Sequence, residues 1–269
     1  MPILQVLQLG TIDFGTALKL QETLVELRKQ GRIADTLLLL EHLPVITLGR
    51  NAKMGNIVAS PEFLAERGVE IFEINRGGDV TFHGPGQLVG YPIVDLRGYS
   101  PRLGAVEFVR KLEEALIRTC GEFHIATGRV PGLTGVWTEE QEQKKVAAIG
   151  VHISRGVTSH GFALNVTVDL EYFKLIVPCG ITDKPVTSME LELGGLVTPG
   201  GKRLEMQSLC EVFTRQFGNV FGTQILWLES LDSILNSAPA NQDVPLREPD
   251  DLKQLHDELT GRDDISFSA

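Results

Sequence analysis

The chain has 269 residues, of which 42% are hydrophobic and 22% are charged, a composition typical of a globular protein with a sizeable core. Its 35 acidic and 25 basic residues give a net charge of −10, which argues against nonspecific binding of nucleic acid. The sequence contains neither a run of 18 apolar residues nor a basic segment followed by an apolar one, so we expect no membrane span and no signal peptide. We therefore expect a cytoplasmic protein that binds neither nucleic acid nor membrane.

The spacing of apolar residues predicts helices interspersed with strands over the first 221 residues. In chain order these are a helix at 14–30, two buried strands within 36–49, a short helix at 61–68, a strand at 69–74, a helix at 102–123, two strands at 145–154 and 157–168, and a helix at 205–221. Arg155–Gly156 joins the last two strands as an antiparallel hairpin. The pattern favours an α+β (mixed α/β) fold, with a mainly antiparallel or mixed sheet flanked by helices, over a strict βαβ repeat.

The C-terminal part differs in composition from the rest. Residues 229–269 hold ten acidic and three basic residues, a net charge of −7, which leaves −3 on the first 228 residues. The apolar pattern fades after about residue 236, apart from one candidate helix at 249–260. We expect a folded domain in residues 1–230 and an acidic, partly disordered extension in 231–269.

Glycines are concentrated in residues 76–90, which read RGGDVTFHGPGQLVG. The segment does not fit a dinucleotide-binding loop, because Val89 stands where the third glycine belongs, and it lacks the lysine of a phosphate-binding loop. One interpretation is a pair of tight turns around a short strand. The other is a loop whose backbone lines a substrate groove, with polar contacts from Arg76, Asp79 and His83.

The three cysteines fall into two groups. Cys120 and Cys210 lie on apolar helix faces, so we expect buried, unreactive thiols with a raised pKa. Cys179 stands between Pro178 and Gly180, outside any helical face, and is either an incidental residue or a nucleophile that needs a partner to ionise it. An odd count without Cys-x-x-Cys spacing predicts neither disulfides nor a zinc site and suits a reducing compartment.

Lys145 is the candidate partner that the pattern favours. In a strand it shares a face with Ala147, Ile149 and Val151, whereas Lys144 points the opposite way. A lysine beside such an apolar row is partly desolvated, which favours its neutral, proton-accepting form. The alternative is a solvated lysine at a strand end. The histidines lack the spacing of metal ligands, so no metal is expected.

Five segments taken together resemble the octanoyltransferases of lipoate biosynthesis. They are Leu48–Asn51, Arg76–Leu88, Lys145–Gly150, His160–Val166, and Pro178–Ile181 with Val186–Ser188. The resemblance covers residues 4–225 and implies the fold of biotin and lipoate protein ligases. It also implies an enzyme that takes an octanoyl group from octanoyl-acyl carrier protein as a cysteine thioester. That enzyme passes the group to a lysine of a lipoyl domain, in 2-oxo acid dehydrogenase E2 subunits and the glycine cleavage H protein.

Carried over residue by residue, the resemblance makes Cys179 the nucleophile and Lys145 its base, and it implies no cofactor. It implies that the acyl site is lined by Arg76, Gly77, Gly78, Asp79, Val80, Thr81, Phe82, His83, Ala148, Ile149, Gly150, Gly161, Phe162 and Ala163. Burial of an eight-carbon chain requires an apolar groove, for which Phe82, Leu88 and Phe162 are candidate lining.

Three alternative functions stay open on the sequence alone. An ATP-dependent lipoate or biotin protein ligase would form an acyl adenylate and need no cysteine. A cysteine hydrolase would pair Cys179 with His83 or His160 in place of Lys145. A noncatalytic binding module would use Cys179 structurally.

Overall fold

The structure is a computed structural model that describes residues 2–177 and 184–236. The strands are β1 Ile3–Ile12, β2 Asp35–His42, β3 Val45–Leu48, β4 Glu70–Glu73, β5 Val80–His83, β6 Gln87–Ile93, β7 Thr127–Val130, β8 Leu133–Thr138, β9 Lys145–Ser154, β10 Val157–Asn165 and β11 Gln224–Trp227. The helices are α1 Phe14–Lys29, α2 Pro61–Glu66, α3 Ala105–Glu122, α4 Met189–Leu193, α5 Met206–Phe221 and α6 Leu231–Asn236, with short 3₁₀ turns η1 Met54–Asn56, η2 Leu96–Gly98 and η3 Leu170–Leu175.

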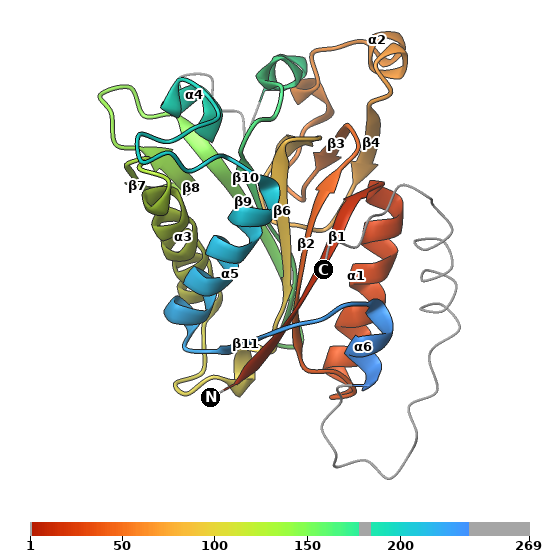
Figure 1. The fold of residues 1–269 in the computed structure, drawn as a ribbon. Coiled ribbons are helices and arrows are strands. Elements are labelled where there is room, and N and C mark those ends of the chain that lie inside the picture. The colour runs from red at the N-terminus through yellow and green to blue at the C-terminus, as the bar shows by residue number, and fades with distance from the viewer. Residues whose placement is uncertain (1, 178–183, 237–269) are drawn as a thin grey trace.

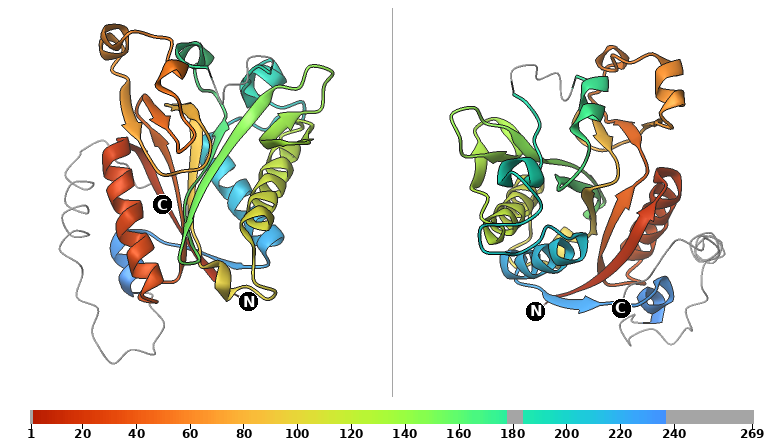
Figure 2. Two further views of the ribbon diagram at one scale, coloured as in Figure 1. Left: turned by 180° about the vertical axis from the view of Figure 1, so that it is seen from behind. Right: turned by 45° about the horizontal axis from the view of Figure 1, so that its top comes forward.

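Two sheets form the framework. The large sheet has the order β11-β1-β2-β6-β10-β9-β8-β7, and the small sheet has the order β4-β3-β5. In the large sheet only β11, β1 and β2 run parallel, and the other neighbours are antiparallel. Helices α3 and α5 cover one face of the large sheet, α1 and α6 lie on the other, and the small sheet lies at one end (Figures 1 and 2). The predicted mixed sheet flanked by helices is confirmed.

The alternation of side chains along each strand divides the core in two. On β2, Leu37 and Leu39 pack toward α3 and α5, whereas Leu38 and Leu40 pack toward α1. Because β2 is buried on both faces, its sequence carries four consecutive leucines rather than an alternating pattern. Strand β1 is also mostly buried, but Gln5 and Gln8 interrupt its apolar residues, so it shows no two-residue period and is absent from the elements predicted above.

The predicted helices and the hairpin are confirmed with small shifts in their ends. Helix α3 begins at Ala105, after the cap residue Gly104, rather than at residue 102. Strands β9 and β10 pair in antiparallel fashion from Ser154 opposite Val157, as the Arg155–Gly156 turn predicts. Strand β10 ends at Asn165, three residues earlier than expected, and the candidate helix at 249–260 lies outside the described residues.

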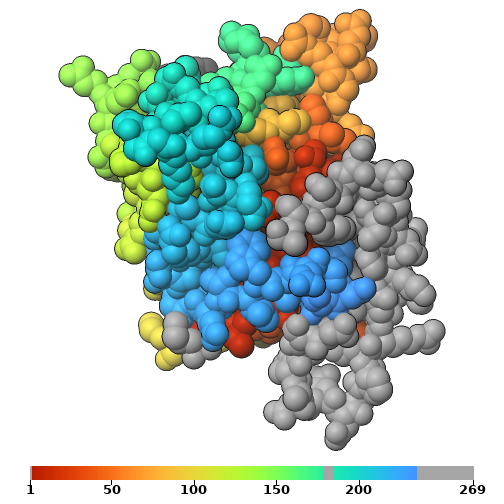
Figure 3. All heavy atoms as spheres, viewed as in Figure 1, coloured from red at the N-terminus to blue at the C-terminus, as the bar shows by residue number. Residues whose placement is uncertain are grey.

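The described chain continues into the core beyond residue 230. Leu231 and Ile234 of α6 are buried in the same cluster as Leu20 and Leu24 of α1. Figure 3 shows the blue residues of this segment lying against the red residues of the N-terminal strand, with which β11 pairs in parallel. No helix within residues 2–177 and 184–236 is long and apolar enough to cross a membrane. The division into 1–230 and 231–269 stays a prediction.

Cys120 and Cys210 are core residues, as predicted. Their exposed fractions are 0% and 1%, and both belong to the cluster between the large sheet and helices α3 and α5. Burial raises the pKa of each thiol to about 12, so neither is ionised at neutral pH.

Replacement of Cys120 by serine is therefore expected to destabilise the protein by about 1–3 kcal/mol, because a hydroxyl is harder to bury than a thiol. Urea unfolding of the wild type and of the Cys120→Ser and Cys120→Ala variants measures this. We expect Ala to cost less than Ser, since it leaves a small cavity but no polar group. Equal stability of Cys120→Ser and the wild type would contradict a buried position for this thiol.

Candidate active site

A pocket opens where the glycine-rich segment of the small sheet meets strands β9 and β10 of the large one. It encloses about 850 Å³ of empty space, part of it open to solvent. The Gly77 N–H donates to the Val151 carbonyl across 3.0 Å, which ties the glycine-rich segment to β9. A Cβ atom at Gly150 would lie 2.7 Å from the Gly77 carbonyl, so the close approach of these backbones requires glycine there. The lining residues are Phe14, Ile74, Arg76, Gly77, Gly78, Asp79, Val80, Thr81, His83, Tyr91, Gly132, Leu133, Thr134, Lys145, Ala148, Ile149, Gly150, His160, Gly161, Phe162 and Ala163.

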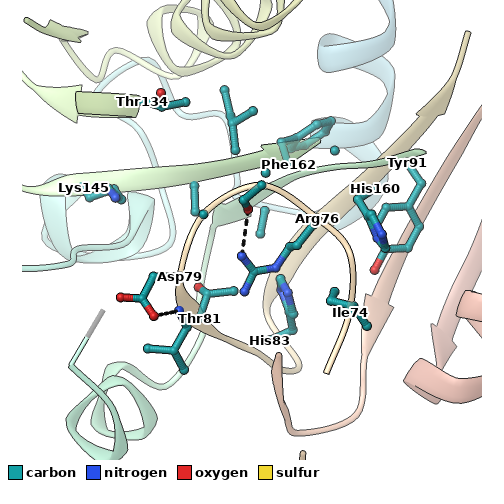
Figure 4. A pocket seen from close by; sticks show the side chains of 18 of the residues that line it. Ile74, Arg76, Asp79, Thr81, His83, Tyr91, Thr134, Lys145, His160 and Phe162 are labelled. Atoms are coloured by element: carbon teal, nitrogen blue, oxygen red, sulfur yellow. Dashed lines mark hydrogen bonds between the residues drawn. The ribbon is translucent and has the colours of Figure 1, made fainter. Parts of the chain in front are cut away.

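Lys145 lies at one end of this pocket, at the start of β9 (Figure 4). Its Nζ lies 4.7 Å from the centre of the Trp137 ring, a cation–π contact that fixes the direction of the side chain. Lys144 points away, toward Glu140 and Glu192, at 3.1 and 3.2 Å. The alternation along the strand thus brings only Lys145 to the pocket, as the sequence predicts.

Both ends of the segment 178–183 are tied to this pocket. After it, the Lys145 N–H donates to the Pro185 carbonyl and the Thr187 N–H donates to the Lys145 carbonyl, each at 2.9 Å. Before it, the Val177 N–H donates to the Asn56 carbonyl across 2.7 Å. Asn56 in turn donates from Nδ2 to the pocket residue Asp79, also at 2.7 Å. The predicted nucleophile Cys179 lies outside the described residues.

A chain of buried hydrogen bonds begins at Arg76 on the pocket wall. Its Nη2 donates to the carbonyl of Thr47 at 2.6 Å and to the Thr47 hydroxyl at 2.9 Å. That hydroxyl lies 3.4 Å from His83 Nε2, and His83 Nδ1 donates to Gln87 Oε1 across 2.7 Å. Because the Gln87 oxygen can only accept, the partners assign the proton of the neutral imidazole to Nδ1.

The same series of hydrogen bonds continues from Gln87 to the segment beside Lys145. Gln87 Nε2 donates to Asn165 Oδ1 at 2.8 Å, and Asn165 Nδ2 donates to the Thr187 carbonyl at 2.9 Å. Each side chain in the series therefore orients the next. The series links the polar wall of the pocket to the backbone that brackets Lys145.

Aromatic rings and imidazoles close the pocket at the end away from Lys145. Tyr91 donates from its hydroxyl to His42 Nε2 at 2.6 Å, and His42 Nδ1 donates to the Ile12 carbonyl at 3.1 Å. The Phe14 ring centre lies 5.1 Å from that of His42 and 6.4 Å from that of His83. Burial lowers the pKa of His42 to about 4 and that of His83 to about 3, so both rings are neutral at pH 7.

His160 lines the same end of the pocket with an unusual backbone. Its φ of 54° lies in the left-handed region, which is uncommon for a non-glycine residue within a strand. The Gln21 side chain accepts its backbone N–H at 2.9 Å, and His160 Nε2 donates to Asn75 Oδ1 at 2.8 Å. Burial lowers the pKa of His160 to about 4.

The sequence has close relatives and a matching family. Residues 13–218 match the family described as the lipoyl protein ligase A/B catalytic domain. An octanoyltransferase of Koribacter versatilis is 62% identical over 256 residues, which cover 95% of this chain and 98% of that protein. An octanoyltransferase of Acidobacterium capsulatum is 61% identical, over 87% of this chain and 96% of the other. The chain belongs to the octanoyltransferase family.

Solved structures support the fold of this octanoyltransferase-family chain. A lipoate-protein ligase A bound with ATP superimposes with a TM-score of 0.68, over 96% of this chain and 94% of the other, at 13% identity. A bipartite lipoate protein ligase from Thermoplasma acidophilum gives 0.62, over 97% and 93%, at 14% identity. The expected lipoate ligase-like fold is therefore confirmed.

Most of the residues that the resemblance assigns to the acyl site meet at this one pocket. Phe82 does not line it. Because strand β5 alternates, Thr81 and His83 face the pocket, whereas Phe82 faces Tyr172 and Phe173, with ring centres at 4.7 and 5.6 Å. Leu88, a second expected lining residue, is also absent from the pocket, because it packs in the core beneath α3 and α5.

The pocket also contains residues that the sequence did not single out. They are Phe14, Ile74, Tyr91, Gly132, Leu133 and Thr134, and His160 joins them from the residues left open. Phe14 and Tyr91 are 2% and 4% exposed, so in the sequence they look like ordinary core positions. Among residues 2–177 and 184–236, no three His, Cys, Asp or Glu side chains come together as metal ligands would.

The neutral histidines make the stability of this octanoyltransferase-family protein sensitive to acid. The pKa of His42, His83 and His160 is lower in the folded chain than its ordinary value of 6.5, so the unfolded chain binds protons more readily below pH 6.5. Their stabilising contribution is complete above pH 6.5 and is lost as the pH falls toward 4. We expect a loss of about 2 kcal/mol per imidazole between pH 6.5 and 5.

Urea unfolding at pH 7, 6 and 5 measures this loss. The matched variant is His42→Gln, whose amide can replace both hydrogen bonds of His42 without titrating. Its free energy of unfolding should fall by about 2 kcal/mol less over the same interval. An identical pH dependence in the variant and the wild type would contradict a neutral, buried His42.

Proposed function

We propose that this protein transfers an octanoyl group from octanoyl-acyl carrier protein, through a thioester on Cys179, to a lysine amine of a lipoyl domain. The acceptors would be lipoyl domains of 2-oxo acid dehydrogenase E2 subunits and the glycine cleavage H protein. The observation that carries the proposal is the position of Lys145, at a pocket to which the chain on both sides of 178–183 is bonded. The octanoyltransferase names of the relatives support it.

In the first step the Cys179 thiolate attacks the carbonyl carbon of the carrier thioester. The new carbon–sulfur bond replaces the bond to the carrier sulfur, which leaves as a thiolate and takes the proton of the Lys145 ammonium, so that Lys145 becomes neutral. The Lys145 ammonium stabilises the Cys179 thiolate by its charge. The exchange of one thioester for another is nearly balanced in energy, so this step needs no ATP and no cofactor.

In the second step the amine of the acceptor lysine attacks the octanoyl-Cys179 thioester. An amide forms, Cys179 leaves as a thiolate, and Lys145 in its neutral form accepts the proton that the amine loses. An amide is more stable than a thioester, which makes this step the irreversible one. Cys179 must stay reduced for both steps, which favours the cytoplasm as the site of action.

The shape and chemistry of the pocket suit an octanoyl group. Its walls include Phe14, Tyr91, Ile149 and Phe162, whose side chains are mostly hydrocarbon. Transfer of the methylenes out of water at about 0.8 kcal/mol each contributes about 5–6 kcal/mol to binding. The catalytic unit would comprise residues 1–230, with 231–269 as an extension whose first residues, Leu231 and Ile234, pack in the core.

One structural observation bears on the hydrolase alternative. Both ring nitrogens of His83 lie within hydrogen-bond distance of neighbouring side chains, and the pKa of the ring is lowered to about 3. A base with so low a pKa takes protons poorly at neutral pH. Lys145 therefore suits the role of proton acceptor better than His83 does.

Intact mass spectrometry tests the proposed function. The purified protein is mixed with octanoyl-acyl carrier protein without ATP, and peptide mapping then locates any added octanoyl group. We expect one octanoyl group on Cys179 and its transfer when a lipoyl domain is added. A protein that acylates a lipoyl domain only when given free octanoate and ATP would instead be a ligase.

A further inference from the structure

We propose that Tyr91 sets the longest acyl chain that the pocket accepts, by closing the end opposite Lys145. The inference rests on the proposed function, because that function places the reacting carbonyl beside Lys145. Figure 4 shows Lys145 and Thr134 at one end of the pocket lining, and Tyr91, His160 and Ile74 at the other. An acyl chain that starts at Lys145 must therefore extend toward Tyr91.

The strand register gives the path between the two ends. Gly150 lies five residues beyond Lys145 on β9, a distance of about 17 Å along an extended strand. Gly150 pairs with Gly161 on β10, and Phe162 pairs with Gly90, the residue before Tyr91 on β6. The pocket thus crosses from β9 over β10 to β6, and the ring of Tyr91 comes at the end of this path.

The end wall, made of the aromatic rings and imidazoles that close the pocket opposite Lys145, is rigid as well as bulky. Tyr91 and Phe14 are 4% and 2% exposed. The Tyr91 hydroxyl is held by His42 at 2.6 Å, and the Phe14 ring packs against His42 and His83. Movement of the Tyr91 ring would break a buried hydrogen bond and leave His42 without its donor, which is costly. An acyl chain too long for the pocket cannot push this wall aside and must leave part of its length outside.

The polar atoms of the wall are already bonded to protein groups. His42 donates to the Ile12 carbonyl, and His160 donates to Asn75. None of the wall residues is among the described residues whose buried polar side-chain atoms have no hydrogen-bond partner. The wall therefore offers carbon to the end of the chain, which favours a saturated, methyl-ended acyl group over one that ends in a polar group.

The experiment compares acyl carrier proteins loaded with hexanoyl, octanoyl, decanoyl and dodecanoyl groups. It measures kcat/KM for transfer to a lipoyl domain by the wild type and by the Tyr91→Val and Tyr91→Phe variants. Valine suits a strand and removes the ring. We expect Tyr91→Val to raise the ratio of decanoyl to octanoyl kcat/KM by about tenfold or more, since one methylene in an apolar pocket is worth at least that much. Tyr91→Phe, which keeps the ring but loses the bond to His42, should shift the ratio much less than Tyr91→Val does.

Each result bears on the proposal. An unchanged ratio in Tyr91→Val would overturn the role of Tyr91 while leaving octanoyl transfer by the wild type intact. An equal shift in Tyr91→Phe would show that the hydroxyl, not the bulk of the ring, sets the limit, which also overturns it. A wild type that transfers no octanoyl group would overturn the proposed function, and this inference with it. If Tyr91→Val does not fold, Phe14→Leu thins the same wall, and an unchanged ratio there counts against the proposal.

Discussion

Replacement of Cys179 by alanine is expected to abolish octanoyl transfer, with a loss of at least about a thousandfold in kcat. The reason is that neither of the two described cysteines can form the thioester, because Cys120 and Cys210 are buried and burial raises the pKa of each to about 12. Transfer to a lipoyl domain and intact mass after incubation with octanoyl-acyl carrier protein are the two measurements. We expect neither product nor an octanoyl-enzyme in the variant.

The matched control is Cys120→Ala, which removes a buried thiol of the core. Because Cys120 lies in the core, this variant should form the octanoyl-enzyme and turn over, with its loss confined to stability. Full turnover by Cys179→Ala would end the covalent mechanism. Loss of turnover in both variants, with both folded, would show that the assay reports something other than the reaction of Cys179.

Replacement of Lys145 by methionine is expected to lower the rate of transfer by about 10²–10⁴-fold. Methionine keeps the length of the side chain and its packing on Trp137, but it has no amine to stabilise a thiolate or to accept a proton. A further measurement separates a chemical role from a structural one. Alkylation of Cys179 by iodoacetamide at pH 7 should slow in this variant, and it should keep its wild-type rate in Lys144→Met.

The chain provides a control in the neighbouring residue. Lys144→Met changes the residue just before β9 and removes the same charge, but this side chain points away from the pocket and pairs with Glu140 and Glu192. It should retain transfer within a few-fold of the wild type. Because the hydrolase alternative uses a histidine, it predicts that Lys145→Met stays active, and that result would favour it.

Local patterns in the sequence were enough to predict the main helices and the β9–β10 hairpin. Helices α3 and α5 have one apolar face each, and the turn at Arg155–Gly156 joins two extended runs. Strand β1 was missed because it is mostly buried and Gln5 and Gln8 interrupt its apolar residues, so it shows no two-residue period. Strands β2 and β3 also belong to different sheets. Local periodicity cannot predict this, because it depends on contacts between residues that are distant in sequence.

Prediction of the pocket from the sequence meets the same limit, because local patterns do not show which residues meet in space. The glycines around Arg76 and the cation at the start of β9 stand out against their neighbours, so the sequence draws attention to them. Tyr91 and Phe14 do not, because a wall made of apolar side chains has the same composition as a core. Phe82 was expected in the lining because the resemblance assigns the whole segment 76–83 to the acyl site, whereas its ring packs against Tyr172 and Phe173, contacts distant in sequence.

The pairing of Lys145 with the residues after position 183 has a consequence for how partner preference can change. The contacts are made by the main chain, through the N–H of Thr187 and the carbonyl of Pro185, so they do not depend on the side chains at 184 and 186. The backbone of Lys145 therefore keeps its place when those side chains are exchanged, although Lys184 Nζ lies 5.9 Å from the centre of the Trp137 ring that Lys145 also contacts. Under the proposed function, substitutions at 184 and 186 change the surface that an acceptor protein meets and leave these main-chain contacts of Lys145 in place.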